Sequence, residues 1–230
     1  MSLTLHTLVK AVSMNIWIVI PAYNEERLIG DNIENLKREG YEQIIVVDDG
    51  SQDKTPEIAK AKGVKVISHK NNQGLGAALR TGLQEAYDQG AEIAVTFDAD
   101  GQHDPRAIPG LINALNGADL AIGVRDRGEM PWNKRVGNFI LDIVTRFFGG
   151  PLIDSQSGFR AFNQRALKKI QICANRYAVS SEIMIQSQEK KLKVKGVPIK
   201  GIFTDYSKAR GTTIASGIKI FLSLLRLKAS

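Results

Sequence analysis

The first half of the chain alternates short apolar runs with longer segments in which apolar residues recur at helical spacing. The apolar runs are almost continuous, which is typical of parallel strands buried on both faces. We interpret five of them as strands, at residues 15–21, 43–47, 64–68, 91–97 and 119–123. Helices are predicted between them, at 28–40, from 55 onward, at 74–90 and at 105–116. This alternation predicts an α/β fold with a Rossmann-like, mostly parallel central sheet flanked by helices.

The pattern changes after the fifth predicted strand. Residues 124–133 are charged, contain Gly128 and Pro131, and are typical of a loop. Beyond this loop we predict helices at 134–148, 164–170 and 181–191, and strands at 157–162 and 192–199. No internal repeat or low-complexity linker divides the chain. We therefore expect a leader segment at 1–13, one domain at 14–213 and a C-terminal amphipathic helix at 214–230.

Composition limits the classes of function. The 230 residues carry a net charge of +7, which favours anionic partners such as nucleotide diphosphates, an anionic membrane surface or nucleic acid. The single Cys173 cannot form an intrachain disulfide, and with only three histidines a Cys/His zinc site is excluded. No run approaches the roughly 20 apolar residues of a membrane-spanning helix. We therefore expect an intracellular protein. The sequence lacks a basic stripe interleaved with aromatic residues, so nucleic acid is a disfavoured partner.

An acidic stretch follows the predicted strand at 91–97. Asp98 and Asp100 stand two residues apart, Gly101 allows a tight turn, and Pro105 suits the first turn of a helix. Ligands of open α/β sheets bind at the carboxyl ends of the strands, and paired carboxylates suit a hard cation such as Mg²⁺ or Mn²⁺. The alternative interpretation is a solvated acidic turn.

Two common phosphate-binding motifs are absent or incomplete. Gly74 and Gly76 resemble part of a dinucleotide fingerprint, but Leu79 stands where the third glycine belongs and the motif does not follow the first strand. The chain has no GxxxxGK[ST] phosphate loop. A Rossmann dehydrogenase and a P-loop NTPase are therefore disfavoured.

Four motifs at successive strand ends together resemble the family-2 glycosyltransferases, nucleotide-sugar enzymes of the GT-A fold. They are Pro21-Ala-Tyr23-Asn24-Glu25-Glu26, Asp48-Asp49-Gly50-Ser51-x-Asp53-x-Thr55, Asn72-x-Gly74-x-Gly76-x-Ala78 and Asp98-Ala-Asp100-Gly-Gln102. The continuation His103-Asp-Pro, with Gly123-x-Arg125 and Asp154-x-x-Ser157-Gly-Phe-Arg160, is similar to the dolichyl- or polyprenyl-phosphate sugar synthases. The resemblance spans residues 14–215 and implies a UDP- or GDP-sugar donor and a lipid phosphate acceptor at a cytoplasmic membrane face.

The resemblance also implies roles for individual residues. Those expected to line the nucleoside pocket are Pro21, Ala22, Tyr23 and Glu25, and the Tyr23 ring can pack on base or ribose. Asp49, with Asp48 beside it, is expected to bind the base, although a cap or turn role is the alternative for both. Gly74 would let the backbone approach the donor, with turn geometry as its alternative. Metal and diphosphate would be held by Asp98, Asp100 and Gln102.

A lipid phosphate acceptor changes what catalysis requires. Its oxygen is largely anionic at pH 7, because the second pKa of a phosphate monoester is about 6, so no strong base is needed. Arg125 and Arg135 are candidates for the acceptor phosphate, and Arg160 and Arg210 for the donor side. Asn138 stands near the position of a serine in these synthases, and Arg210-Gly-Thr-Thr departs from their usual motif.

Three alternatives stay open at this point. A sugar or protein hydroxyl acceptor would need a base, for which Asp154 is the candidate. The chain could also be a non-catalytic nucleotide-binding module. The apolar helices from residues 134 and 214 fit either a membrane surface or ordinary core packing.

Overall fold

The computed structural model describes residues 14–125, 139, 141–143, 145–151, 154–176, 178–200 and 202. Seven strands form one sheet: β1 (Ile16–Ala22), β2 (Ile44–Asp48), β3 (Lys65–Ser68), β4 (Ile93–Thr96), β5 (Leu120–Arg125), β6 (Arg160–Asn163) and β7 (Val194–Ile199). The helices are α2 (Ile29–Arg38), α3 (Thr55–Ala61), α4 (Leu75–Asp88), the 3₁₀ turn η1 (Pro105–Ala107), α5 (Ile108–Ala114), α7 (Gln164–Lys169) and α8 (Val179–Glu189).

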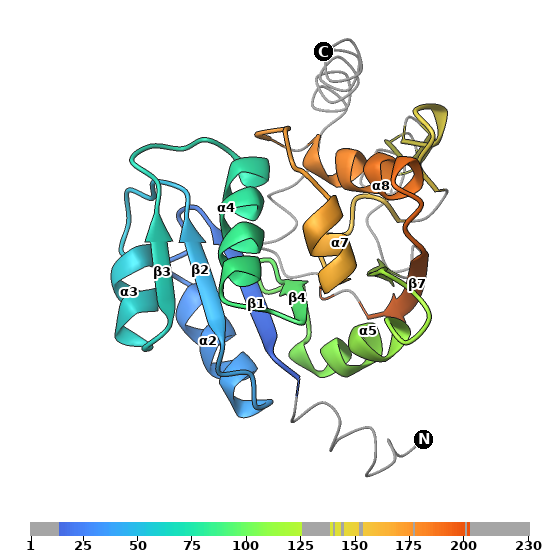
Figure 1. Ribbon diagram of the computed structural model, residues 1–230. Coiled ribbons are helices and arrows are strands. Elements are labelled where there is room, and N and C mark those ends of the chain that lie inside the picture. The colour runs from blue at the N-terminus through green and yellow to red at the C-terminus, as the bar shows by residue number, and fades with distance from the viewer. Residues whose placement is uncertain are drawn as a thin grey trace.

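The sheet has the order β3-β2-β1-β4-β6-β5-β7 and is mostly parallel, as predicted (Figure 1). From β1 the chain builds outward to β2 and β3, and then returns to place β4 on the other side of β1. Ligands of open α/β sheets bind beyond the carboxyl ends of strands at such a change of direction. The loops that follow β1, β2 and β4 therefore meet at one edge.

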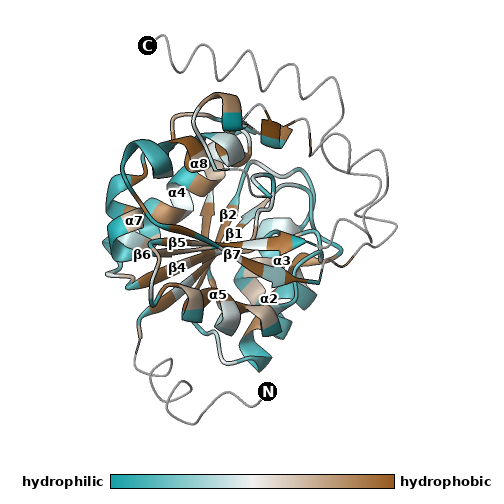
Figure 2. Cartoon of the chain, turned by 90° about the vertical axis from the view of Figure 1, so that its right-hand side faces the viewer, coloured by the Kyte–Doolittle hydropathy of each residue, from teal (hydrophilic) through white to brown (hydrophobic). Residues whose placement is uncertain are grey.

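Helices cover both faces of the sheet (Figure 2). On one face α4, α7 and α8 pack on side chains such as Val19 and Val47. On the other face α2, α3 and α5 pack on residues such as Ile18 and Val46. Both faces of β1 and β2 are thus buried, which explains their almost continuous apolar sequences. A Cβ on Gly82 would lie 2.3 Å from Val19 Cγ1, so this glycine lets α4 approach β1 closely.

The predicted strands all form, but one of them has an orientation that the pattern did not predict. β6 runs antiparallel between β4 and β5, with Val95 opposite Ala161 and Ala121 opposite the same residue on the other side. This insertion brings the segment before β6, residues 154–159, to the carboxyl end of β4. The helix expected at 105–116 begins as the 3₁₀ turn η1 and ends at Ala114.

Several predicted segments lie wholly or partly outside the described residues. The leader at 1–13, the charged loop from 126 and the C-terminal helix at 214–230 are among them, so those assignments stay predictions. Within the helix predicted at 134–148, residues 141–143 and 145–147 are helical. In the part of the chain that the structure describes, every helix is too short or too polar to cross a membrane.

Candidate active site

The loops after β1 and β2 are joined by hydrogen bonds from backbone amides to side chains. The amide of Asn24 donates to Ser51 Oγ at 2.9 Å, and the amide of Gln52 donates to Asn24 Oδ1 at 2.8 Å. The amide of Glu25 donates to Thr55 Oγ1 at 2.8 Å. These reciprocal contacts hold two loops as one wall beside the carboxyl end of β1. Pro21 and Ala22 are the last two residues of β1, and 40% of the next residue, Tyr23, is exposed.

Asp49 is buried, and neighbouring groups of the chain occupy both of its carboxylate oxygens. Oδ1 lies 2.7 Å from His69 Nδ1 and accepts the amide of Gln73 at 3.0 Å, while Oδ2 accepts the amide of Gly74 at 2.7 Å. Asp48 accepts the amide of Ser51 at 3.1 Å, which is the turn role considered for it. The contacts of Asp49 fasten the loop before α4 to β2. Base recognition by Asp48 and Asp49 stays a prediction.

The beginning of α4 is covered by another part of the chain. The carbonyl of Asn175 accepts the amides of Gly76 at 2.8 Å and Ala77 at 3.2 Å. Glu182 of α8 holds this covering segment, because its carboxylate accepts the amides of Cys173 and Ala174. Gly74 has φ of 101°, and a Cβ there would lie 2.4 Å from Asn175 O. Close packing thus accounts for this glycine, and its contact with the donor stays a prediction.

Gly76→Ala is expected to destabilise the fold, because the added Cβ would lie 1.8 Å from the carbonyl oxygen of Ala174. Such overpacking against backbone costs about 3 kcal/mol, or roughly 6–12 °C in melting temperature for a chain of this size. Gly117→Ala is the matched control, since a Cβ there meets nothing within 4 Å. Equal melting temperatures for the two variants would contradict the close packing at the start of α4.

Asp98 and Asp100 lie just beyond the carboxyl end of β4, where Gly101 turns the chain with φ of 75°. Gln102 contacts Asp100 twice: its amide donates to Oδ1 at 3.1 Å, and its side-chain nitrogen donates to Oδ2. Burial raises the pKa of Asp98, and burial together with the charge of Asp98 raises the pKa of Asp100.

The chemistry of these three residues fits a divalent cation. Both carboxylates are disfavoured in their charged forms by burial, and a cation would reverse that preference. Among the described residues no three His, Cys, Asp or Glu side chains are grouped to hold a metal. A pair of carboxylates with an amide oxygen is nevertheless a typical protein share of a Mg²⁺ or Mn²⁺ site, in which substrate phosphates and water supply the other ligands.

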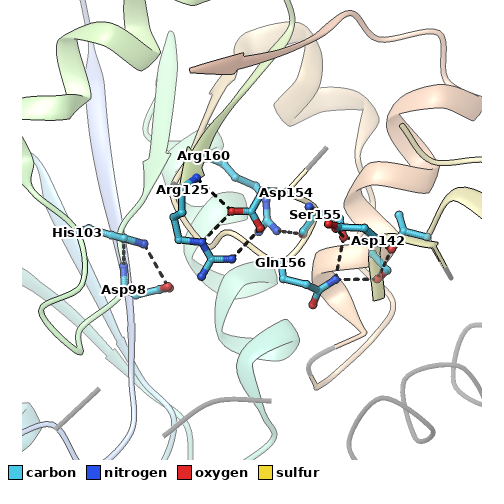
Figure 3. A network of polar contacts seen from close by, with 10 residues as sticks. Asp98, His103, Arg125, Asp142, Asp154, Ser155, Gln156 and Arg160 are labelled. Carbon is cyan, nitrogen blue, oxygen red and sulfur yellow. Dashed lines mark hydrogen bonds and ion pairs between the residues drawn. The ribbon is translucent and has the colours of Figure 1, made fainter. Parts of the chain in front are cut away.

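His103 contacts Asp98 at two points (Figure 3). The amide of Asp98 donates to His103 Nδ1 at 3.0 Å, and His103 Nε2 lies 3.5 Å from Asp98 Oδ2. The imidazole stacks on Phe159 with a centroid distance of 4.5 Å and an interplanar angle of 12°. Burial lowers the pKa of His103 to about 4, so the ring is neutral at pH 7. Sequence reasoning assigned no role to His103, although it stands within the acidic motif.

The segment before β6 packs directly on Asp98. A Cβ on Gly158 would lie 2.2 Å from Asp98 Oδ2, so only glycine leaves room for the carboxylate. Thr96 Oγ1 donates to the carbonyl of Gly158 at 2.6 Å and ties the two segments together. Gly158 belongs to the motif that follows Asp154, but sequence reasoning assigned it no role of its own.

Arg125 and Asp154 form a bidentate ion pair near the carboxylate of Asp98 (Figure 3). Arg125 Nε lies 2.8 Å from Oδ2 and Nη2 lies 2.7 Å from Oδ1, and the backbone amide of Arg125 adds a contact at 3.3 Å. Asp154 is almost completely buried. The oxygens of Asp154, the candidate base, therefore accept two guanidinium N–H groups and the backbone amide of Arg125.

Arg160 is completely buried and donates from Nη2 to the carbonyl of Ser155 at 2.9 Å. Its Nε and Nη1 find no hydrogen-bond partner within the described ranges, and the same holds for the buried hydroxyl of Ser157. Burial lowers the pKa of Arg160 to about 10, and nearby Asp98 and Asp154 oppose that shift. The guanidinium of Arg160 is therefore charged at pH 7 and places positive charge near Asp98 and Asp154.

The structure brings together most of the predicted site residues. The loops after β1, β2 and β4 meet at one sheet edge. Arg125 and Arg160, carried by β5 and β6, lie close enough to Asp98 for their charges to act on its carboxylate, and Asp154 pairs with Arg125. Two predicted phosphate-binding residues, Arg135 and Arg210, lie outside the described residues.

Comparison with known proteins agrees with this arrangement. Residues 17–171 match the sequence model of glycosyl transferase family 2. The UDP-N-acetylglucosamine–dolichyl-phosphate N-acetylglucosaminyltransferase of Methanococcus voltae is 43% identical over 240 residues, covering 93% of this chain and 96% of that protein. An uncharacterized protein of Methanocaldococcus jannaschii is 49% identical over 223 residues, covering 93% and 92%.

A solved structure shows the same fold. Glucosyl-3-phosphoglycerate synthase from Mycobacterium tuberculosis, in complex with Mg²⁺ and UDP, matches with a TM-score of 0.73 and 23% identity, covering 95% of this chain and 82% of that chain. The predicted GT-A fold is confirmed by this likeness.

Proposed function

Since this chain belongs to glycosyl transferase family 2 and is a nucleotide-sugar glycosyltransferase, we propose that it moves a sugar to a dolichyl or polyprenyl phosphate. The donor is a UDP- or GDP-sugar, the reaction depends on Mg²⁺ or Mn²⁺, and it inverts the anomeric carbon. UDP-N-acetylglucosamine is the first donor to test, because the relative from Methanococcus voltae is named for it.

The observation that carries the choice of acceptor is the bidentate pair of Arg125 and Asp154. A hydroxyl acceptor needs a general base with a free lone pair within reach of the proton. The oxygens of Asp154 already accept three N–H groups, so this carboxylate is poorly placed for that work. A phosphate acceptor is already ionised at pH 7 and needs cationic groups instead. Arg125 supplies such a group near Asp98, whereas Arg160 is completely buried and adds only its positive charge.

The residues divide the work as follows. Asp98, Asp100 and Gln102 would hold the cation. A bound Mg²⁺ or Mn²⁺ would neutralise charge that develops on the departing nucleotide diphosphate. Asp154 fixes the guanidinium of Arg125, whose remaining N–H groups can orient an acceptor phosphate for attack on the anomeric carbon. The joined loops after β1 and β2 form one wall for the nucleoside, with Tyr23 exposed on it.

A transfer assay with two matched acceptors tests this proposal. The purified chain is incubated with Mn²⁺ or Mg²⁺, one labelled UDP- or GDP-sugar at a time, and either polyprenyl phosphate or the corresponding polyprenol. We expect label to enter the organic phase only with the phosphate and only with the divalent cation present. Transfer to polyprenol, without transfer to the phosphate, would overturn the acceptor assignment. Nucleotide binding without turnover on any acceptor would favour the non-catalytic alternative.

An exposed apolar stripe supports a position at a membrane surface. Phe139, Ile143 and Phe147 are spaced four residues apart on a helical segment, and 77% of Phe147 is exposed. Asp142 of the same segment accepts the amide of Ser155 at 2.9 Å, so the stripe is attached to the segment that carries Asp154. Exposed aromatic side chains on a protein with a net charge of +7 are suited to an anionic lipid interface.

Phe147→Ser is expected to weaken binding to vesicles of anionic phospholipid by about tenfold, because burial of a Phe side chain contributes about 1.5 kcal/mol or more. Co-sedimentation measures the bound fraction, and vesicles of neutral phospholipid serve as the comparison. Equal retention of the variant and the wild type on anionic vesicles would contradict a membrane role for the stripe.

A further inference from the structure

We propose that His103 is a positioning residue, which holds the Asp98 carboxylate in the orientation needed for the divalent cation through a proton on Nε2. The inference rests on the proposed function, since it assigns a task in the cation site of that function. It concerns a residue that contacts Asp98, Phe97 and Phe159 and that the sequence motifs left without a role.

The tautomer of His103 follows from its contacts. The amide of Asp98 points at Nδ1 at 3.0 Å, so Nδ1 is an acceptor and carries no proton. In a neutral imidazole the proton then resides on Nε2. That atom lies 3.5 Å from Asp98 Oδ2, so its N–H is next to the carboxylate. The imidazole thereby contacts both the backbone amide and the carboxylate of Asp98.

The imidazole and the Asp98 carboxylate both pack against neighbouring residues. Phe159 stacks on one face of the ring, and Phe97 meets the edge with centroids 5.4 Å apart. On the side of Asp98 that faces β6, the backbone of Gly158 lies so close that a Cβ would overlap the carboxylate. The Asp98 carboxylate is thus close to both Gly158 and His103. Removal of a residue that orients a metal-coordinating side chain commonly lowers the affinity for the metal by about 10- to 100-fold.

Two variants with amide side chains separate the two nitrogen contacts of His103. In His103→Asn the side-chain oxygen takes the place of Nδ1 and can still accept the amide of Asp98, but no donor reaches the carboxylate. In His103→Gln the side-chain nitrogen takes the place of Nε2 and can still donate to Asp98 Oδ2, but the acceptor is lost. Both variants lose the ring that stacks on Phe159, so the difference between them reports the polar contact rather than the packing.

Mn²⁺ binding is measured by electron paramagnetic resonance, with Mn²⁺ alone and with UDP added, and melting temperatures are recorded for every variant. We expect His103→Asn to weaken Mn²⁺ binding by about 10- to 100-fold and His103→Gln to stay within about threefold of the wild type. Phe159→Leu, which keeps both nitrogens of His103, is expected to lower the melting temperature while Mn²⁺ affinity stays within the same threefold.

The outcomes separate the inference from the function on which it rests. Equal Mn²⁺ affinities for His103→Asn and His103→Gln, or a loss in Phe159→Leu as large as in His103→Asn, would overturn the positioning role. Asp98→Asn tests the cation site itself. If the wild type bound no Mn²⁺ with or without UDP, or if Asp98→Asn bound it as well as the wild type does, the cation site would be wrong and the inference would fall with it.

Discussion

Replacement of Asp100 by asparagine is expected to lower sugar transfer at least about a thousandfold. The variant keeps the size of the side chain but removes one of the two charges that would hold the cation. Stabilisation of developing charge on a phosphate by a metal contributes several kcal/mol, and about 4 kcal/mol corresponds to a factor of a thousand in rate. The measurement is the initial rate of label transfer to polyprenyl phosphate at saturating donor.

Asp104→Asn is the matched control, because it removes a carboxylate from the same acidic stretch. Asp104 caps the 3₁₀ turn η1 through the amide of Arg106 at 3.0 Å and pairs with the exposed side chain of Arg106. Asparagine is as good a capping residue, and an exposed ion pair contributes little, so transfer and stability are expected to change little. Turnover by Asp100→Asn that remained metal-dependent and fast would place the cation elsewhere.

The architecture could be predicted from sequence because its signals are local. β1 and β2 are buried on both faces, and each therefore appears as a continuous apolar run that ends in a polar turn. The orientation of β6 could not be predicted this way. Four residues of strand sequence are the same whether the strand runs parallel or antiparallel, and only its position between β4 and β5 decides the direction.

The same distinction applies to the site. Asp98 and Asp100 could be predicted because they directly follow a strand, and strand ends gather at one edge of the sheet. The packing of His103 involves Phe159, which lies 56 positions further along the chain and reaches the ring through the insertion of β6. For Asp154 the sequence indicated a carboxylate near the site, whereas its engagement by Arg125 is a matter of side-chain geometry.

The pair formed by Arg125 and Asp154 gives the second large expected effect. We expect Arg125→Met and Asp154→Asn each to lower transfer to polyprenyl phosphate by about a hundredfold, because both lose the orientation of the same guanidinium. The double variant Arg125→Met/Asp154→Asn is expected to lose about a hundredfold as well, and not the ten-thousandfold that two independent contributions would give. Residues that act as one unit show this non-additivity in a double-mutant cycle.

Stability measurements make the cycle interpretable. Arg125→Met leaves the buried charge of Asp154 without its partner, which costs about 3 kcal/mol or more, so its melting temperature should fall. The double variant leaves no such charge and is expected to melt higher than Arg125→Met alone, while its activity is no better. If Asp154 acted as a base independently of Arg125, activity losses would multiply in the double variant. That result would return a hydroxyl acceptor to consideration, since only a hydroxyl needs its proton removed.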